Sequence, residues 1–281
     1  MTELGTVAAI FRYPVKSMLG ESIESAEVRD TGIAGDRVWA VRDESRGNFM
    51  TGKRVGALMG CLGRSPESGS GVPEIELPTG EAFRADDPAA GQRLSDYLGH
   101  RVTLWPCGSP PVERAPAASP AELDAILARA PGEPQPDLST IPKDLLEFGG
   151  RPAKPFVDLA PLMLLTSESI AAMQRSAPEA TIDVRRFRPS VMIDASARSR
   201  FPEQDWIGRR VRVGDSVWQV RMTCPRCVMT THGFAGLPQD STVMRRLVSE
   251  AGGNLGVYAS VERPGRIRVG DAVEALRESA P

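Results

Sequence analysis

Aromatic residues are scarce in this sequence, and charge of neither sign dominates it. Aromatic side chains make up 5% of the 281 residues, which is too few to predict the stacking platforms that bind single-stranded nucleic acids. The formal net charge is −2, so no overall basic field would attract nucleic acid or an anionic membrane. We therefore expect neither a nucleic-acid partner nor a membrane partner, and any site for an anion must be local.

Long apolar runs and nucleotide-binding fingerprints are also missing. No run approaches the ~20 apolar residues that a membrane span requires, and residues 1–5 lack the basic start and apolar core of a secretory signal. Four cysteines in so long a chain do not make a disulfide framework, so we expect a reducing, cytoplasmic location. No Gly-x-Gly-x-x-Gly follows a predicted strand, and no phosphate loop ending in Gly-Lys-Ser/Thr occurs.

Short strand patterns recur in both halves of the chain. Residues 7–13, 23–28 and 38–41 are predicted to be short strands, and their spacing is typical of a small barrel or sandwich. Later, the strand pattern at 210–215 is echoed at 266–271, and each ends in a Gly-Asp turn. We expect a mixed α+β fold, mainly β, in which an N-terminal β-barrel-like domain precedes a second β-barrel domain with peripheral helices.

The middle of the chain reads as a connection between these halves. Ser119-Pro120-Ala121-Glu122 is a capping box with proline at the first helical position. The apolar face of the helix that follows consists of Leu123, Ile126 and Leu127. Prolines are dense from 131 to 155. The predicted division is therefore an N-terminal domain at 1–115, a helix and proline-rich linker at 116–155, and a second domain at 156–281.

The run Cys-Pro-Arg-Cys at 224–227 holds half of the cysteines. A guanidinium beside a sulfur favours the thiolate, the form that attacks electrophiles and binds soft metals. A redox dithiol fits the spacing, although Val-Met-Thr-Thr after Cys227 begins a helix poorly. Zinc needs four ligands, and only Cys224, Cys227 and His232 lie close in sequence. The other two cysteines, Cys61 and Cys107, fit small buried hydrophobes.

One cysteine bound to a soft metal within an anionic cofactor is the remaining alternative. It predicts basic and hydroxyl side chains at turns, because a phosphate is bound by arginine forks, lysine and hydroxyl donors. Lys16, Ser17 and Arg37 occupy such positions in the first half, and the cluster Arg185, Arg186 and Arg188 does so in the second. Any one of these charges is otherwise an ordinary solvated residue.

Six motifs occur in order: Tyr-Pro-Val-Lys-Ser at 13–17, Gly-Asp-Arg-Val-Trp at 35–39, Phe-Arg-Pro-Ser at 187–190, Cys-Pro-Arg-Cys-Val-Met-Thr-Thr at 224–231, Leu-Gly-Val-Tyr at 255–258 and Arg-Val-Gly-Asp at 268–271. With them the chain resembles the MOSC family, named after the C-terminal domain of molybdenum cofactor sulfurase. It is most similar to the branch with an N-terminal MOSC β-barrel domain, which includes the mitochondrial amidoxime-reducing component and its bacterial relatives. The resemblance covers nearly the whole chain.

The resemblance implies a molybdenum–molybdopterin cofactor bound between the two domains. By position, Cys227 is the catalytic cysteine and the metal ligand, and Arg226 contacts the cofactor and helps to keep Cys227 deprotonated. The other implied cofactor-binding residues are Lys16, Ser17, Arg37, Ala160, Arg188, Ser190 and Tyr258. Cys224 has no required role in this assignment.

Two motifs depart from the family pattern. Phe-Arg-Pro-Ser ends in Ser190 where the family has asparagine, so a hydroxyl replaces an amide near the implied cofactor. The family's Thr-Thr-Val-Asp-Pro is Thr-Thr-His-Gly-Phe here, with His232 and Gly233. If this loop lines the substrate entrance, substrate preference differs from that of the amidoxime reducers.

The resemblance implies a molybdenum-dependent oxidoreductase that reduces small N-hydroxylated compounds. The chain lacks a nucleotide fingerprint and the cysteine spacing of a plant-type iron–sulfur site, so a separate flavin or iron–sulfur reductase is the expected electron donor. The alternative on the same fold is a non-redox carrier of molybdenum cofactor, or of sulfur as a persulfide on Cys227. A zinc-stabilised interaction protein is the alternative from another class.

Overall fold

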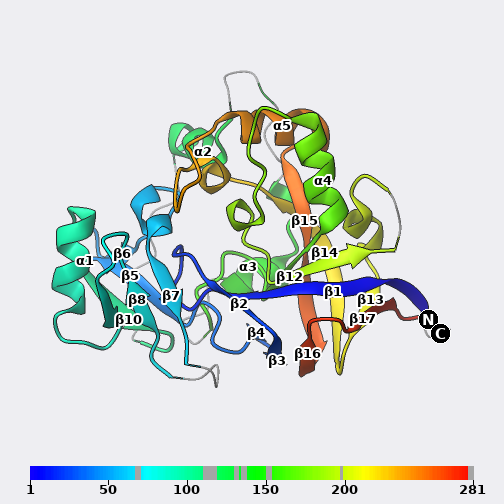
Figure 1. The fold of residues 1–281 in the computed structure, drawn as a ribbon, viewed down its shortest axis with the longest axis horizontal. Coiled ribbons are helices and arrows are strands. Elements are labelled where there is room, and N and C mark those ends of the chain that lie inside the picture. The colour runs from blue at the N-terminus through cyan, green and yellow to red at the C-terminus, as the bar shows by residue number, and fades with distance from the viewer. Residues whose placement is uncertain are drawn as a thin grey trace.

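The computed structural model describes residues 1–66, 71–109, 119–129, 133, 138–149, 154–196 and 199–277. The fold is mixed α+β and built mainly from strands, which confirms the predicted class (Figure 1). The helices are α1 (Ala90–Leu98), α2 (Pro120–Leu127), α3 (Lys143–Gly149), α4 (Ser167–Ser176) and α5 (Thr242–Ala251). The strands are β1 (Thr2–Arg12), β2 (Glu21–Ile23), β3 (Ser25–Arg29), β4 (Gly32–Ile33), β5 (Trp39–Asp43), β6 (Asn48–Phe49), β7 (Leu62–Arg64), β8 (Glu74–Glu76), β9 (Ala82–Arg84), β10 (Val102–Pro106), β11 (Leu162–Thr166), β12 (Val191–Ala195), β13 (Arg210–Val213), β14 (Ser216–Pro225), β15 (Asn254–Arg263), β16 (Gly265–Arg268) and β17 (Ala272–Ala275).

Seven strands form a closed β-barrel. Their order is β12-β11-β15-β14-β13-β17-β1, and a further pairing between β1 and β12 closes the ring. The pair β11–β12 is parallel, and the other pairs of the ring are antiparallel. Closure leaves no free edge within the ring, so the backbone groups of each strand are paired on both sides.

Strand β1 joins the start of the chain to this barrel. It pairs with β12 and β17, whereas the other six strands of the ring all lie between Leu162 and Ala275. The first residues therefore pack as part of the second half. The predicted boundary at residue 115 lies outside the described residues, and the division into 1–115, 116–155 and 156–281 stays a prediction.

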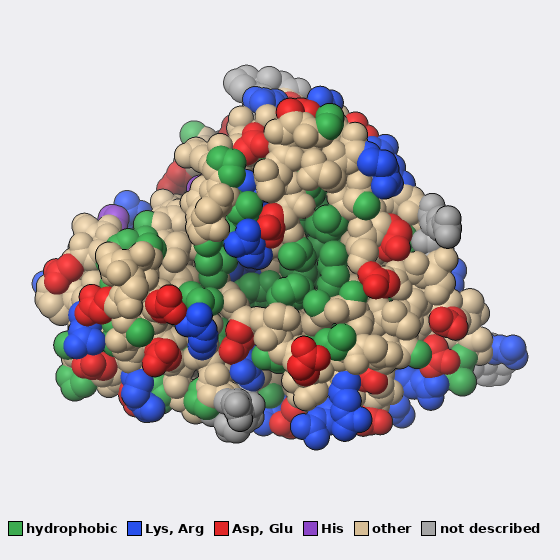
Figure 2. Space-filling view, viewed as in Figure 1, with side chains coloured by type: hydrophobic (Ala, Val, Ile, Leu, Met, Phe, Trp, Pro, Cys, Tyr) green, Lys and Arg blue, Asp and Glu red, His purple; other side chains and the backbone are tan. Residues whose placement is uncertain are grey.

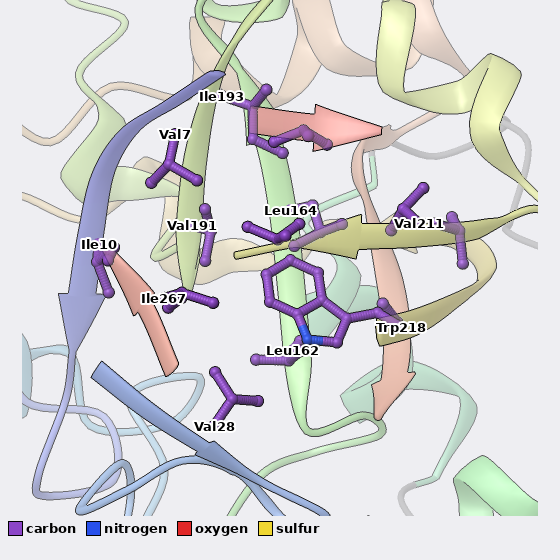
Figure 3. Packing of buried hydrophobic residues seen from close by; sticks show 14 of the residues in the cluster. Val7, Ile10, Val28, Leu162, Leu164, Val191, Ile193, Val211, Trp218 and Ile267 are labelled. Atoms are coloured by element: carbon purple, nitrogen blue, oxygen red, sulfur yellow. The ribbon is translucent and has the colours of Figure 1, made fainter. Parts of the chain in front are cut away.

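The barrel interior is filled by aliphatic side chains around Trp218 (Figure 3). The indole of Trp218 is fully buried, and its Nε1 donates a hydrogen bond to Ser216 Oγ at 2.7 Å, so its polar atom is satisfied. Val28 of β3 and Ile267 of β16 belong to the same core. The small sheet β16-β3-β4 is thereby packed against the barrel.

Two other small sheets and α1 form a second core beside the barrel (Figure 1). The sheets are β10-β5-β6 and β7-β8-β9, and their buried residues gather around Val15, Met18 and Leu94. Cys61 is buried in this core, and burial raises the pKa of its thiol to about 12. All four cysteines are free thiols.

The helices of the second half lie on the outer face of the barrel. Buried residues of α4 and α5 pack against Met163 and Leu165 of β11, which point away from the interior. The predicted capping box of α2 is confirmed, because Ser119 Oγ accepts from the Glu122 amide while the Glu122 carboxylate accepts from the Ser119 amide. None of the helices in the described part of the chain is long and apolar enough to cross a membrane.

Candidate functional site

A cavity of about 460 Å³ lies between turns of residues 16–53 and the outer face of the barrel. Figure 2 shows a recess of this mixed character, with hydrophobic side chains on its floor and charged side chains beside them. All nine residues to which the sequence assigned a role line the cavity: Lys16, Ser17, Arg37, Ala160, Arg188, Ser190, Arg226, Cys227 and Tyr258. The structure thus brings together residues that lie up to 242 positions apart (258 − 16); their roles stay predictions.

Three of these residues have a left-handed backbone. Ser17, Arg37 and Arg188 have φ angles of 67°, 52° and 55°, and none of them is glycine. Side chains with a Cβ rarely adopt this conformation, and each instance costs of order 1 kcal/mol or more. Strain of this kind persists where a side chain has to point in one direction, and here each of the three reaches the cavity.

Two guanidinium groups share one aromatic ring at the cavity wall. The Cζ atoms of Arg37 and Arg188 lie 4.8 Å and 4.3 Å from the centre of the Tyr13 ring. Arg37 pairs with Asp36, and Arg188 Nη1 donates to the carbonyl of Met18. Burial, and after it the like charge of Arg37, lowers the pKa of Arg188 to about 10. The pair of cations is costly on its own and favours an anion between the two halves.

A second charged group is built around Asp158. Its carboxylate accepts from Lys16 Nζ at 2.6 Å and pairs with Lys53 Nζ at 2.7 Å, and Lys16 Nζ also donates to the Phe156 carbonyl at 2.8 Å. Burial acts to raise the pKa of Asp158, but the two lysines outweigh it and hold that pKa well below its usual range. Burial lowers the pKa of Lys16, while Asp158 raises that of Lys53.

The sequence reasoning assigned no role to Lys53 or Asp158, although both line the cavity. Signals for them were present. Lys53 is a basic residue shortly after β6, and Asp158 stands two residues before Ala160. Lys53 thus shares with Lys16 and Arg37 the position of a basic residue in a turn, and this was the signal for it.

The Cys-Pro-Arg-Cys run begins at the end of β14 and leads directly into the cavity wall. Cys224 is 2% exposed, and Arg226 Nη1 donates to its Sγ at 2.8 Å. Arg226 was expected to contact the cofactor and to help keep Cys227 deprotonated. Its guanidinium donates a hydrogen bond to Cys224, and its role toward Cys227 stays a prediction. Cys227 is half-buried, lines the cavity and precedes the 3-10 helix Val228–Thr231.

The Arg226 guanidinium and the Tyr258 phenol both interact with Cys224. Burial, and after it contact with Cys224, raises the pKa of Tyr258 well above its ordinary value. Burial acts to lower the pKa of Arg226, but Cys224 and Tyr258 outweigh it. Arg226 Nη2 donates to the Phe187 carbonyl, whereas Arg226 Nε is buried without a hydrogen-bond partner among the described residues.

Of the arginine cluster before β12, only Arg188 forms part of the cation pair at the Tyr13 ring. Arg185 is held at the surface by Asp183. Arg186 is fully buried and donates to four backbone carbonyls, those of Thr181, Thr230, His232 and Pro238, at 2.7–3.1 Å. Although Arg186 reaches the cavity wall, its guanidinium is used to fix the loop after Cys227.

Ser190 and His232, the two departures from the family pattern, both make defined contacts. Ser190 is 2% exposed, and its Oγ accepts from the Met163 amide at 3.1 Å. His232 Nε2 lies 2.8 Å from the carbonyl oxygen of Gly52, so the loop after Cys227 is tied to the first half. No group of three or more His, Cys, Asp or Glu side chains that could hold a metal ion occurs in the described ranges.

Comparison with known proteins gives matches over both halves. Residues 153–274 match the family model for the MOSC domain, and residues 4–68 match that for the MOSC N-terminal beta barrel domain. The mitochondrial amidoxime reducing component 2 of Bos taurus is 26% identical over 308 residues, covering 97% of this chain and 84% of the relative. The mitochondrial amidoxime-reducing component 1 of Homo sapiens is 24% identical, covering 98% and 84%.

Among solved structures, the YUAD protein from Bacillus subtilis matches with a TM-score of 0.44 and 9% identity, over 96% of this chain and 94% of that one. The two matched ranges contain most of the barrel strands and all nine cavity residues named above. The chain therefore belongs to the MOSC family and carries the N-terminal β-barrel domain of that family.

Proposed function

We propose that the protein binds a molybdenum cofactor in this cavity and reduces N-hydroxylated compounds there. One observation carries the proposal: Cys227 and basic side chains from both halves of the chain line the same cavity. The likeness to amidoxime-reducing components at 24–26% identity supports the reaction class.

The residues present fit such a cofactor. The cavity wall holds one acidic residue, Asp158, against six basic ones: Lys16, Arg37, Lys53, Arg186, Arg188 and Arg226. This excess of positive charge suits an anionic pterin phosphate, and the buried, unpaired Nε of Arg226 is a donor that such a group would satisfy. The volume of about 460 Å³ is within the usual range for cofactor sites. A cysteine sulfur is the protein ligand that soft metals prefer.

When bound, the cofactor supplies the two-electron chemistry that removes oxygen from an N–O bond. The overall reduction of N–OH to N–H consumes two electrons and two protons and releases water. Arg37 and Arg188 bind the anion from the two halves, and Cys227 presents its sulfur to the metal. Lys16 and Lys53 hold protons at Nζ on the cavity wall. The electrons come from a separate flavin or iron–sulfur protein.

Expression in a host that makes the cofactor tests the proposal. We expect about one molybdenum per chain, release of pterin on denaturation, and reduction of an amidoxime by an artificial electron donor. Cys227→Ser should abolish turnover, and the matched Cys224→Ser should retain most of it. The opposite pattern contradicts the assignment of Cys227. Molybdenum without turnover indicates a cofactor carrier, and zinc in its place indicates an interaction protein.

A further inference from the structure

The cavity has a second wall of opposite chemistry. Leu123, Ile126 and Leu127 of α2 line it together with Ile141 and Leu146, which lie just before and within α3. The cationic wall and Cys227 belong to other segments of the chain. A ligand that fills the whole cavity must therefore offer a polar or anionic part to one wall and an apolar part to the other.

This apolar wall comes from a part of the chain that neither family model matches. The matched ranges end at residue 68 and resume at residue 153, and α2 and α3 lie between them. Helix α2 contacts the 3-10 helix Val228–Thr231 that directly follows Cys227. The apolar wall therefore comes from the stretch between the two matched ranges and lies beside the cysteine.

The lining residues of this segment and their neighbour Leu145 differ in how deeply they are buried. Leu127 and Ile141 are at most 9% exposed, and Leu145 is 2% exposed, so these three anchor the segment. Leu123 and Ile126 are only half-buried, and Leu146 is 47% exposed. Large apolar side chains left open beside a cluster of cations are unfavourable in water, and an apolar ligand group would cover them.

We propose that Leu123, Ile126 and Leu146 form a subsite for an apolar substituent of the substrate. The inference rests on the proposed function, which places the N–O group near Cys227 and the anionic cofactor against the arginines. The apolar wall is then the surface left to the rest of the substrate. The preferred substrates are N-hydroxylated compounds that carry an alkyl or aryl group, and small polar ones are reduced poorly.

A homologous series of straight-chain alkyl amidoximes measures the subsite. Each methylene that is buried against an apolar wall is expected to raise kcat/KM about threefold to fourfold until the wall is covered. In Leu123→Gln/Ile126→Gln the increase should fall below about 1.5-fold per methylene, because glutamine keeps the size and the helix propensity while making the wall polar. The shortest member should change by less than about twofold. The matched control is Ala125→Gln, an exposed position on the same helix, which should keep the wild-type increase.

A binding measurement separates this inference from the proposed function. Titration calorimetry of the same amidoximes into molybdenum-loaded protein without an electron donor should show the same dependence of Kd on chain length. If no amidoxime is turned over by loaded protein, the proposed function fails. The subsite is refuted if amidoximes are turned over but kcat/KM of the wild type does not rise with alkyl chain length. It is also refuted if kcat/KM rises equally steeply in the double variant.

Two further outcomes decide the remaining possibilities. If the double variant slows every member of the series equally, the wall serves the electron donor, and the subsite is refuted. If the double variant does not fold, Leu146→Gln takes its place, because this side chain is already nearly half exposed. A smaller increase of kcat/KM per methylene in Leu146→Gln than in the wild type supports the subsite, and an unchanged increase overturns it.

Discussion

At the residue scale, like charges lie close together in the wall of the cavity. Arg37 and Arg188 lie on one aromatic ring, and Lys16 and Lys53 lie on one carboxylate. Such groups contribute little to stability, because buried like charges repel and burial removes their hydration. Their arrangement suits the anion site that we propose.

Arg188→Asn tests this reading of the cation pair. Asparagine tolerates the left-handed backbone at this position, and the variant removes a charge whose burial lowers its pKa to about 10. We expect the free energy of unfolding of the cofactor-free protein to change by less than about 1 kcal/mol, because lost contacts and relieved repulsion offset each other. Pyrophosphate should raise the melting temperature of the wild type and not that of the variant, as measured by differential scanning calorimetry. A loss above about 3 kcal/mol, with the pyrophosphate effect retained, contradicts the reading.

Asp158→Asn should weaken the protein in a pH-dependent way. The folded pKa of Asp158 is depressed by the lysines, so its contribution is fully present above the unfolded pKa of about 4 and is lost as pH falls through the lower folded value. The side chain is 43% exposed, so solvent screening limits the expected cost at pH 7 to about 1 kcal/mol.

Urea unfolding at pH 7 and at pH 3 measures this difference. The gap between wild type and Asp158→Asn should narrow at the lower pH, because the Asp158 carboxyl is protonated in the unfolded wild-type chain, whose pKa is about 4 there, and this favours unfolding. Asp86→Asn, at an exposed ion pair with Arg84, is the matched control and should leave stability nearly unchanged at both values. A gap that widens in acid would show that the lysines do not depress the pKa of Asp158.

The sequence predicted which residues meet at the cavity better than it predicted their contacts. The motifs singled out Lys16, Arg37 and Arg188, and these residues line the same cavity, while their roles stay predictions. The partner of Arg226 could not be read in the same way. Whether its guanidinium turns to Cys224 or to Cys227 depends on packing against Phe187 and Tyr258, which come from other elements.

At the element scale, β1 is the strand that closes the barrel, and it needs a glycine to do so. Gly5 has φ +154°, and a Cβ at this position would lie 2.1 Å from the carbonyl oxygen of Asp194 in β12. Gly5→Ala should therefore separate β1 from β12 and cost about 2–4 kcal/mol of unfolding free energy. Chemical denaturation measures the cost.

Gly80→Ala is the matched control for this prediction. Gly80 also has a positive φ, +86°, but nothing lies within 4 Å of an added Cβ. Gly80→Ala should lower the free energy of unfolding by about 1 kcal/mol, because only the left-handed backbone conformation disfavours alanine there. Equal losses in the two variants would mean that the contact with β12 does not limit the packing of β1.

Local elements were readable from sequence, and the closure of the barrel was not. The capping box of α2 lies within four consecutive residues, so its geometry follows from the local sequence. The pairing of Val7 in β1 with Ile193 in β12 joins residues 186 positions apart (193 − 7). A strand pattern shows which face is buried but does not show which distant strand it pairs with.

At the scale of the whole molecule, the two halves depend on each other. The first strand completes the barrel, the His232 ring binds the Gly52 carbonyl, and the cavity needs cations from both halves. A fragment of residues 156–277 leaves β12 and β17 with unpaired edges, which promotes aggregation. We expect this fragment to be insoluble or unfolded, and the full chain to unfold in one transition, by circular dichroism.

A peptide of residues 1–13 added to the fragment during refolding is the control. It supplies β1, and recovery of soluble, folded fragment would show that this strand is what the fragment lacks. A fragment that folds alone, with the melting temperature of the full chain, would show instead that β1 is dispensable and that the second half is an independent domain.

The proposed function requires the sulfur of Cys227 to be bound to molybdenum in the loaded protein. X-ray absorption at the molybdenum edge counts the sulfur neighbours of the metal directly. We expect one fewer sulfur neighbour in Cys227→Ser than in the wild type and no change in Cys224→Ser. An unchanged sulfur count in Cys227→Ser, or a loss confined to Cys224→Ser, would contradict it.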